Sequence, residues 1–484
     1  MKPPSFDTPS IVWFSNDLRL GDHRALTRAA ARGPVVPLYI HDDSTPPMGG
    51  AAAWALHQAL HALGADLAAR GLPLVLRRGK ALDILRDVIA ATGARHVTWS
   101  RRYEPAVAAR DADIASALRE DGIETSTHSG FLLFEPESIR TGAGTMFKVY
   151  TPFSRACFAA PPPERPLPVP QNLRGVDGVK GDTLDALKLV PRTAQWPRGL
   201  AQAWDIGEAA AQDRLRDFTA RALTGYTTDR DRPDIDGTSR LSPHLHIGTI
   251  SPRQIWHAIM RHGGGEKYLQ EILWRDFSWH LLTQIPDFIT EPLQKSFARF
   301  PWRDDPAGLR AWQQGMTGYP IVDAGMRQLW QTGWMHNRVR MIAASFLVKD
   351  LLIDWRQGAA WFADTLVDAD LGSNTASWQW VAGCGADAAP YFRIFNPTLQ
   401  GAKFDPRGDY VRRFIPELAR LDARYIHEPW KAPADMLARA GVQMGKTYPF
   451  PVLDHAHARQ RALAALKFSK SEAGQPPESA DLFD

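Results

Sequence analysis

The sequence predicts an α/β protein in two parts, a doubly wound, Rossmann-like parallel sheet followed by an all-helical domain. Three observations predict this class. Short apolar runs alternate with helical spacing in the first third of the 484 residues, a proline-dense stretch interrupts the middle, and helical apolar spacing runs from Gly207 onward. Apolar residues make up 44% of the chain, which is enough for a substantial core and fits two domains.

The first part alternates candidate strands with candidate helices. Residues 11–14, 35–40, 72–76 and 96–99 are short apolar runs of the kind found in buried strands. Between these runs, apolar residues recur at helical spacing in three segments: Leu56, Leu60, Leu63 and Leu67; Leu82, Leu85 and Ile89; Val107, Ile114 and Leu118. No glycine fingerprint of the dinucleotide or P-loop type is present, so a phosphate-bearing cofactor must bind elsewhere or differently.

Proline density marks a connector after the sheet. Residues 161–170 include six prolines, which oppose a regular helix or a central strand and favour extended chain. We therefore expect four regions: the α/β domain at 1–134, a linker at 135–203, the helical domain at 204–468, and a disordered tail at 469–484, where large apolar residues are scarce.

Charge and cysteine content exclude several classes of protein. Lys plus Arg number 57 and Asp plus Glu number 53, a net charge of +4, so a nucleic-acid site must be a local patch. Two cysteines, Cys157 and Cys384, are too few for a disulfide scaffold or a cysteine-ligated metal site. No apolar run reaches membrane-span length, and residues 1–9 lack the apolar stretch of a signal peptide, so we expect a cytoplasmic protein without a membrane partner.

Two stretches of the helical part combine charge with hydroxyl or aromatic groups. Thr238-Ser239-Arg240-Leu241-Ser242-Pro243 fits either a capped helix start or a phosphate site at free N–H groups. Glu271, Trp274 and Arg275 share one helix face. That face is either an exposed ion pair beside a core tryptophan or a surface that stacks a base and holds a phosphate.

A third stretch, from Trp334 to Met341, is rich in arginine and amide groups. Helical spacing places Asn337, Arg340 and Met341 on one side and Arg338 on a neighbouring side. This pattern equally fits a helix start with solvated arginines.

The fourth stretch places acids close to aromatic residues. Asp368 and Asp370 are followed by Asn374, Trp378 and Trp380. An Asp-x-Asp pair can bind a divalent metal, but no histidine or third carboxylate accompanies it at ligand spacing, so we expect no metal site.

In order and spacing, these stretches resemble the flavin domain of the DNA photolyase and cryptochrome family. The motifs that carry the resemblance are Thr238–Pro243, Trp274-Arg275-Asp276-Phe277, Thr317-Gly318-Tyr319-Pro320-Ile321-Val322-Asp323-Ala324, Gly333–Arg338, Ala344-Ser345-Phe346-Leu347, Asp368-Ala369-Asp370, Trp378-Gln379-Trp380 and Tyr391-Phe392-Arg393-Ile394-Phe395-Asn396-Pro397. Near the start, Trp13-Phe14, Asp17-Leu18-Arg19 and Asp22 resemble the family's α/β antenna domain. The resemblance therefore covers nearly the whole chain except the tail.

The resemblance implies FAD bound in a U-shape inside the helical domain. Its pyrophosphate is expected on Thr238, Ser239, Arg240, Leu241 and Ser242, with further contacts from Tyr226, Arg275, Arg340, Asp368 and Asp370. Asn374 corresponds to the residue that faces flavin N5, and Arg340 with Asp368 to the ion pair beside the ring. An amide at N5 can hydrogen-bond a reduced flavin without supplying a readily transferred proton.

The substrate that the resemblance implies is a cyclobutane pyrimidine dimer in ultraviolet-damaged DNA, flipped out of the duplex. The implied enzyme is a deoxyribodipyrimidine photo-lyase, in which light-excited FADH⁻ passes an electron to the dimer and recovers it after the ring splits. Trp274 and Trp380 correspond to the walls of the lesion pocket, Met341 to an apolar contact, and Asn337 and Glu271 to polar ones, with Glu271 also stabilising the anionic dimer. The positions that correspond to contacts along the DNA strand are Arg230, Arg338, Arg393 and Gln400.

The 17 tryptophans divide in the same way. Trp378, Trp355 and Trp302 correspond to the family's electron relay from the protein surface to oxidised flavin. Ordinary core packing is the expectation for Trp54, Trp196, Trp204, Trp256, Trp312 and Trp361.

Two alternatives remain within the family. Six-four photolyases usually carry paired histidines where this chain has His336-Asn337, whereas Asn337, Arg338 and Met341 follow the class I cyclobutane-dimer pattern. A cryptochrome-like blue-light sensor is the other alternative; the retained pocket residues argue against it. A dark flavin oxidoreductase, the third hypothesis considered, lacks any nicotinamide-binding fingerprint.

The second, antenna chromophore stays open. After Tyr103-Glu104 the chain reads Pro105-Ala106-Val107-Ala108, without the Asn-Glu pair that holds methenyltetrahydrofolate in folate-type members. Ser15 and His23 also depart from the Arg and Asn that are usual near the antenna. Deazaflavin, a second flavin or no antenna remain as alternatives. We expect a monomer that binds damaged DNA and needs no obligate protein partner.

Overall fold

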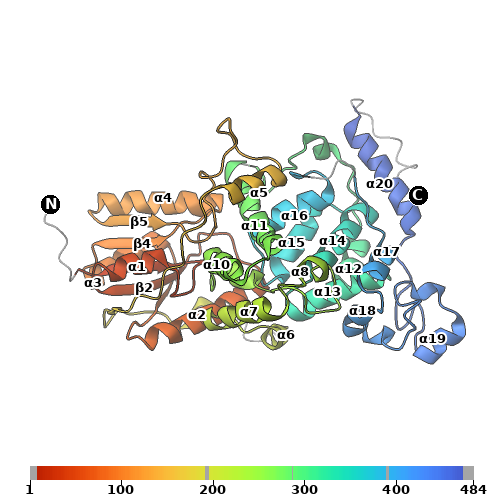
Figure 1. The fold of residues 1–484 in the computed structure, drawn as a ribbon, viewed down its shortest axis with the longest axis horizontal. Coiled ribbons are helices and arrows are strands. Elements are labelled where there is room, and N and C mark those ends of the chain that lie inside the picture. Colours follow the sequence, from red (N-terminus) through yellow and green to blue (C-terminus); the bar gives the residue numbers. More distant parts are fainter. Residues whose placement is uncertain (1–7, 191–195, 286, 388–391, 472–484) are drawn as a thin grey trace.

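The computed structural model describes residues 8–190, 196–285, 287–387 and 392–471, with a sheet at one end and helices at the other (Figure 1). Within these residues one parallel sheet has the order β3-β2-β1-β4-β5. Its strands are β1 (Ser10–Phe14), β2 (Val35–His41), β3 (Val75–Arg78), β4 (His96–Ser100) and β5 (Glu124–His128). The central strand β1 pairs with both β2 and β4, so the chain winds outward in two directions and the predicted doubly wound fold is confirmed.

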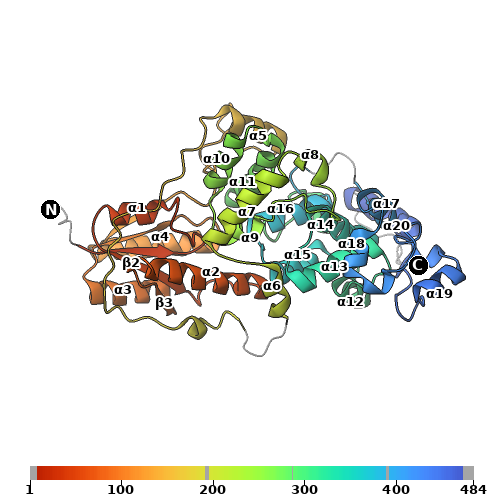
Figure 2. The ribbon, with the colours of Figure 1, turned by 60° about the horizontal axis from the view of Figure 1, so that its bottom comes forward.

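Helices cover both faces of the sheet (Figure 2). Val12 and Phe14 pack with α1 (Arg24–Ala30) and α2 (Gly50–Ala68). Ile11 and Trp13 point the other way and pack with α3 (Ala81–Thr92) and α4 (Pro105–Glu120). Because neighbouring residues of β1 are buried on opposite faces, the strand reads as one continuous apolar run.

The structure departs from the sequence prediction at two strands. The third strand begins at Val75, three residues later than expected, because Leu72 instead packs in the core between α2 and the sheet. Strand β5 was not predicted, because its residues, Glu-Thr-Ser-Thr-His, are polar and partly or fully exposed. A strand at the edge of a sheet has a neighbouring strand on one side alone and is more open to solvent, so polar residues are tolerated and the apolar pattern is weak.

The predicted linker contributes to the helical core. Residues 161–170 have no regular structure, as the prolines indicated, but α5 (Tyr150–Ala159) precedes them, and η1 (Leu184–Leu187) and α6 (Pro197–Ala203) follow. Tyr150, Phe153 and Cys157 on α5 are buried in the same cluster as α11 (Glu266–Gln284). The domain boundaries themselves remain a prediction.

The rest of the described chain is helical, as predicted. Beside α11, the larger helices are α7 (Glu208–Arg221), α10 (Pro252–His262), α12 (Pro306–Gln314), α13 (Pro320–Thr332), α14 (Asn337–Ser345), α15 (Trp355–Thr365), α16 (Leu371–Ala382), α17 (Pro397–Phe404) and α20 (His455–Lys470). The short elements are α8 (Tyr226–Asp229), α9 (Ser242–Ile247), η2 (Lys295–Arg299), η3 (Phe346–Asp350), α18 (Asp409–Phe414), η4 (Pro416–Leu418), η5 (Pro429–Lys431) and α19 (Ala434–Ala440). Helix α16 lies at the centre, because it packs against α11, α14 and α15.

The start of the predicted tail belongs to the last helix. Ser469 and Lys470, expected in the tail, form the last turn of α20, with Ser469 buried; the tail from 472 onward lies outside the described residues. No helix in the described part of the chain is long and apolar enough to cross a membrane.

The tryptophans assigned to the core divide into two groups. Trp54, Trp204, Trp256 and Trp312 are buried, as predicted. Trp196 and Trp361 are half-buried and pack against the edges of the core clusters. Trp361 also stacks on Trp330 with ring centroids 5.9 Å apart, and Trp330 is 55% exposed.

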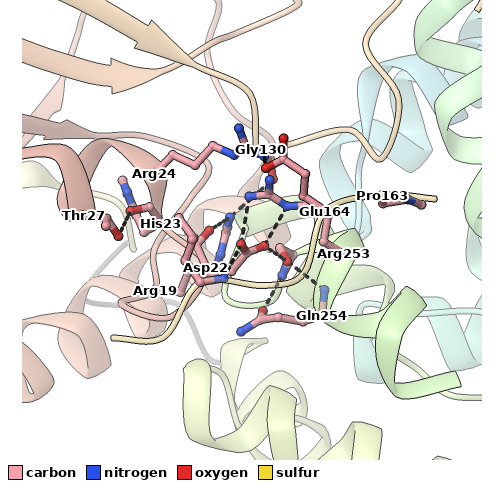
Figure 3. A network of polar contacts seen from close by, with 12 residues as sticks. Arg19, Asp22, His23, Arg24, Thr27, Gly130, Pro163, Glu164, Arg253 and Gln254 are labelled. Carbon is pink, nitrogen blue, oxygen red and sulfur yellow. Dashed lines mark hydrogen bonds and ion pairs between the residues drawn. The ribbon is translucent and has the colours of Figure 1, made fainter. Parts of the chain in front are cut away.

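Buried Arg19 ties the sheet domain to the helical domain (Figure 3). Its guanidinium donates to the carbonyl oxygens of Gly248 at 2.9 Å and of Gly130 at 3.3 Å. Gly248 follows α9 and Gly130 follows β5, so one side chain connects both domains.

Asp22 completes this joint from the same loop. Its carboxylate accepts from the Ser251 hydroxyl at 2.5 Å and from Arg253 Nε at 3.0 Å, and also from the backbone N–H of Leu167 in the connector (Figure 3). Asp22 has a left-handed backbone, with φ of 53°, which Asp tolerates better than most residues. The sheet, the connector and the helical domain therefore meet at one buried carboxylate.

Candidate active site

Asp368, just before α16, binds two of the other predicted cofactor residues, Arg340 and Ser242. Its carboxylate accepts from Arg340 Nη2 at 2.9 and 3.1 Å and from the Ser242 hydroxyl at 2.6 Å. Arg340 is fixed further because its Nε donates to the carbonyl of Met335 at 2.7 Å. The predicted Arg340–Asp368 ion pair is present, and it joins α14, the start of α9 and the loop before α16.

Asp370 plays a second joining role at the N-terminus of α16. It caps the helix by accepting from the N–H of Ser373 at 2.8 Å, and it accepts from Trp279 Nε1 at 3.0 Å. Arg275 lies 3.6 Å from it and donates to the carbonyl of Phe131. The Nη2 of Arg275 is buried and has no hydrogen-bond partner in the described structure.

The segment from Thr238 to Ser242 runs beside these carboxylates. Arg240 has a left-handed backbone with φ of 51°, a strained conformation that clusters at ligand sites. Its guanidinium lies 5.2 Å from the centre of the Trp334 ring, and that of Arg340 lies 5.9 Å from the same ring. Leu241 is buried, whereas Ser242 is exposed and Thr238 and Ser239 are half-buried.

Tyr226 and Asn374 border this group of residues. Tyr226 is buried against Tyr268, with ring centroids 5.2 Å apart, and the Tyr268 hydroxyl donates to Ser239 Oγ at 2.9 Å. Asn374 lies one helical turn after Asp370, and its side-chain amide donates to the carbonyl of Ala359 at 3.0 Å. The structure thus places every predicted cofactor residue on α8, α9, α11, α14 or α16 or in the loops beside α9 and α16.

The chemistry of this group fits FAD. Three arginines and three hydroxyls suit a pyrophosphate, and the unpartnered Nη2 of Arg275 is a buried donor that a ligand oxygen can satisfy. Asp368 and Asp370 are each engaged by an arginine, and the described residues include no group of three His, Cys, Asp or Glu suited to a metal ion.

Trp274, a predicted wall of the lesion pocket, lies on the same helix as Arg275. Its ring stacks on Tyr150 of α5, with centroids 3.6 Å apart and planes 10° from parallel. The Tyr150 hydroxyl donates to the carbonyl of Gln270 at 2.5 Å, which fixes the stacked ring. Tyr150 was missed because it falls in the predicted linker, although Tyr150, Phe153 and Cys157 show helical apolar spacing.

Glu271 and Arg230, predicted separately as lesion and DNA contacts, form an ion pair with each other. Lys267 lies 3.7 Å from the same carboxylate, one helical turn away. The Arg230 guanidinium also lies 5.6 Å from the centre of the Tyr226 ring. Both members of the pair are partly exposed, so each can exchange its partner for a ligand.

The other predicted pocket residues come from α14 and α16. Trp380 is half-buried, and its Nε1 donates to the carbonyl of Asp387 at 3.1 Å. Asn337 is exposed at the start of α14, and Met341 is half-buried one turn later. Helix α16 packs against both α11 and α14, but no ring contact joins Trp274 to Trp380 in the part of the chain described.

Three predicted DNA contacts, Arg338, Arg393 and Gln400, line one open cavity of about 640 Å³. The other lining residues are Thr228, Asp231, Arg232, Phe395, Lys403 and Phe404. Arg338 forms an ion pair with Asp231 at 2.8 Å, and its guanidinium lies 4.5 Å from the centre of the Phe404 ring. Sequence analysis missed these two partners because they lie far from Arg338 along the chain.

The predicted relay tryptophans lie in or against a single apolar cluster. Trp378 and Trp355 are each 2% exposed, and Trp302 is partly buried against the same cluster. Their ring contacts are with other aromatic residues rather than with one another: Trp378 with Phe362 at 5.0 Å and Trp302 with Phe300 at 4.3 Å. The relay therefore stays a prediction.

His336, the first residue of the His336-Asn337 pair on which the choice between lesion classes rests, is buried before α14. Its Nδ1 accepts from the N–H of Arg338 at 3.2 Å. Burial lowers the pKa of His336 to about 4, so the ring is neutral at neutral pH.

Two residues near the predicted antenna region are held by neighbours within the sheet domain. Glu104 accepts from Arg102 at 2.7 and 3.1 Å, and His23 lies 3.0 Å from Asp17. Burial raises the pKa of Asp17, but the His23 charge and several hydrogen bonds outweigh it and hold that pKa below its usual range. The identity of the second chromophore stays open.

Comparison with known proteins places these observations in a family. Residues 10–171 match the family described as DNA photolyase, and residues 268–468 match the family described as FAD binding domain of DNA photolyase. The chain is 52% identical to a deoxyribodipyrimidine photo-lyase of Agrobacterium fabrum over 94% of its own length and 97% of the relative's length. Cryptochrome-1 of Arabidopsis thaliana is 36% identical over 93% of this chain and 69% of that protein.

A solved structure agrees with the fold described above. The crystal structure of a class III photolyase from Agrobacterium tumefaciens has a TM-score of 0.93 and 51% identity, covering 96% of this chain and 98% of that chain. The pattern around Asn337 follows class I in the sequence analysis, whereas this solved structure is of a class III photolyase. The matches extend over both the sheet and the helices, and the chain belongs to the DNA photolyase and cryptochrome family, with an FAD-binding helical domain.

Proposed function

We propose that this chain is a deoxyribodipyrimidine photo-lyase that splits cyclobutane pyrimidine dimers in ultraviolet-damaged DNA under light. The observation that carries the proposal is the composition of α11. Within five residues this helix carries Glu271 and Trp274, which are predicted lesion contacts, and Arg275, which lies 3.6 Å from Asp370 among the predicted cofactor residues. One rigid element thus connects the group that recognises the lesion with the group that holds the cofactor.

The residues of the chain bind and orient the reacting groups. When bound, reduced FAD supplies the light-excited electron that splits the dimer and recovers it afterwards. Arg275, Arg340 and Ser242 would hold the cofactor, because their donors surround Asp368 and Asp370. Asn374 can offer an amide that does not readily transfer a proton.

The lesion side uses stacking and charge. Trp274, backed by Tyr150, offers a fixed aromatic plane for one face of a flipped-out dimer. Glu271 can accept a hydrogen bond from the polar edge of the pyrimidine once Arg230 releases it. Arg338, Arg393 and Gln400 supply cationic and amide groups for the sugar-phosphate backbone, which agrees with a small net charge and a local DNA site.

Cyclobutane dimers are a better candidate than six-four products because Asn337, and not a second histidine, follows His336. The neutral, buried ring caps α14, and the next residue is Asn337 rather than a second histidine. The paired histidines of six-four photolyases are therefore missing at this position. The match to a class III photolyase at 51% identity favours class III over the class I pattern.

We also propose that the protein acts as a monomer in the cytoplasm and that it needs no protein partner. The antenna chromophore stays open between a folate, a deazaflavin, a second flavin and none. Absorption of the chromophores released by denaturation identifies it.

Repair of ultraviolet-irradiated oligothymidylate under blue light, with a matched dark sample, tests the proposal. The expected result is recovery of thymine absorbance in the light alone. Protein that binds FAD and is photoreduced, yet repairs nothing, contradicts the proposal and supports the sensor alternative.

A further inference from the structure

The predicted lesion and DNA contacts are joined by a chain of alternating charges. Glu271 pairs with Arg230, whose Nε lies 3.9 Å from Oδ1 of Asp231. Oδ2 of Asp231 lies 2.8 Å from Arg338 Nη2. Each oxygen of Asp231 therefore faces a different arginine, and the four side chains are 15% to 33% exposed.

Among the described residues that line the cavity of Arg338, Arg393 and Gln400, Asp231 is the one acidic residue. Two of the four cations that line it are already paired, Arg338 with Asp231 and Arg232 with Asp234. A DNA phosphate that approaches Arg338 is repelled by the Asp231 carboxylate. It must also compete with that carboxylate for the Arg338 guanidinium.

The 3.9 Å contact with Arg230 offers Asp231 a second ion-pair partner when the ion pairs rearrange. If a lesion draws Glu271 away from Arg230, that arginine is left without its carboxylate. Asp231 already borders Arg230 and can pair with it, which frees Arg338 for a phosphate. Partly exposed ion pairs are weak enough for such an exchange.

We propose that Asp231 is a specificity-determining residue, which keeps Arg338 from DNA phosphates until a lesion engages Glu271. This inference rests on the proposed function. Undamaged DNA leaves Glu271 paired with Arg230, so its phosphates must compete with Asp231 for Arg338. Damaged DNA engages Glu271, Asp231 then pairs with Arg230, and Arg338 becomes free to bind a phosphate. Asp231 lowers affinity for undamaged DNA more than affinity for the lesion.

The test measures dissociation constants of Asp231→Asn for undamaged and irradiated oligothymidylate in the dark. We expect binding of undamaged DNA to tighten about twofold to fivefold, the range of a partly exposed ion pair, while lesion binding changes less. The salt dependence of undamaged binding should steepen by about 0.7, the slope of one further single-strand phosphate contact. Weaker or unchanged binding of undamaged DNA overturns the proposal, because it assigns Asp231 a purely structural role.

Two further variants test whether the effect on affinity comes from the carboxylate at position 231 or from the loss of one negative charge anywhere on the protein. Asp435→Asn removes the same charge from the exposed Asp435–Arg439 pair on α19, which lies apart from α8 in both views (Figures 1 and 2). It should leave both affinities unchanged; equal tightening would assign the effect to net charge and overturn the proposal. Asp231→Glu keeps the charge and should retain weak binding of undamaged DNA.

Coupling to Glu271 is tested with a double-mutant cycle. In Glu271→Gln, Arg230 loses its partner and Asp231 turns to it, so Arg338 is already free. Asp231→Asn should then tighten undamaged binding by less than twofold in the Glu271→Gln background; an additive effect overturns the exchange. Light-driven repair by the wild type keeps the two hypotheses apart: absence of repair refutes the proposed function, whereas repair with unaltered affinities in Asp231→Asn refutes this inference alone.

Discussion

Two charge networks of the molecule differ in how much water reaches them. In the joint between the domains, the side chains of Asp22 and Arg253 are 0% and 5% exposed. In the chain from Glu271 to Arg338, the four side chains are 15% to 33% exposed. Buried ions cannot exchange partners without a large desolvation penalty, whereas partly exposed ions can. The first network therefore fixes the domains, and the second can respond to a ligand.

The largest effect is expected from breaking the buried network. Asp22→Ala removes the acceptor of Ser251 and Arg253 and leaves a buried guanidinium unpaired. We expect the free energy of unfolding to fall by about 3–5 kcal/mol in urea denaturation. Asp22→Asn, which keeps one acceptor and tolerates the left-handed backbone, should lose less. A loss below about 1 kcal/mol for Asp22→Ala would show that the joint is not a stabilising centre.

A second buried carboxylate, Asp276, makes stability depend on pH. Its Oδ2 accepts from the N–H groups of Leu133 and Phe134 at 3.0 and 2.9 Å. Burial raises the pKa of Asp276 to about 7, so the folded protein holds this proton more tightly than the unfolded chain. The stabilisation is complete below the unfolded pKa of about 4 and is lost as the pH rises toward 7, at about 1.4 kcal/mol per pH unit.

Asp276→Asn keeps an oxygen for these two N–H groups and removes the titration. The decline in unfolding free energy between pH 5 and pH 8 should therefore be smaller in the variant than in the wild type. Equal declines would mean that Asp276 does not titrate in this range.

In the partly exposed lesion region, Trp274→Ala should weaken binding of the lesion and leave binding of undamaged DNA unchanged. Loss of one aromatic plane against a base costs about 1–3 kcal/mol. Dissociation constants for irradiated and undamaged oligothymidylate measure the effect. Trp330→Ala, which removes a 55% exposed tryptophan outside the predicted pocket, is the matched control. Equal weakening for both DNAs would remove Trp274 from lesion recognition.

The smallest effect is expected at Tyr150, which touches Trp274 rather than the lesion. Tyr150→Leu removes the stacked partner and should weaken lesion binding by about 0.5–1.5 kcal/mol. Tyr150→Phe keeps the ring and should bind nearly as the wild type does. If both variants weaken binding equally, the hydroxyl bond to Gln270, rather than the stack, positions the tryptophan.

Sequence pattern predicted the parts of the fold that depend on local burial. The inner strands β1 and β2 were found because buried residues on both faces leave continuous apolar runs, and β4 was found from Val97 and Trp99. Edge strand β5 was missed because its polar residues leave no such run. The helix that carries Tyr150 was hidden by the prolines that follow it.

The sequence could predict which residues belong to the site, but not which of them contact one another. Family motifs identified Glu271, Arg230 and Arg338, yet Glu271 and Arg230 are 41 positions apart in sequence. Their ion pair depends on how α8 lies against α11. Asp231 carries no motif of its own in the sequence analysis, and its role follows from its place between two arginines.

The most direct measurement compares two DNA duplexes that are identical except for the lesion, a cyclobutane thymine dimer in one and a six-four product in the other. Each is incubated with reduced, FAD-loaded protein in blue light and in the dark, and restored thymines are quantified. We predict repair of the cyclobutane dimer in the light only, with the six-four product left intact. Repair of the six-four product, or of neither lesion, would contradict the proposed function.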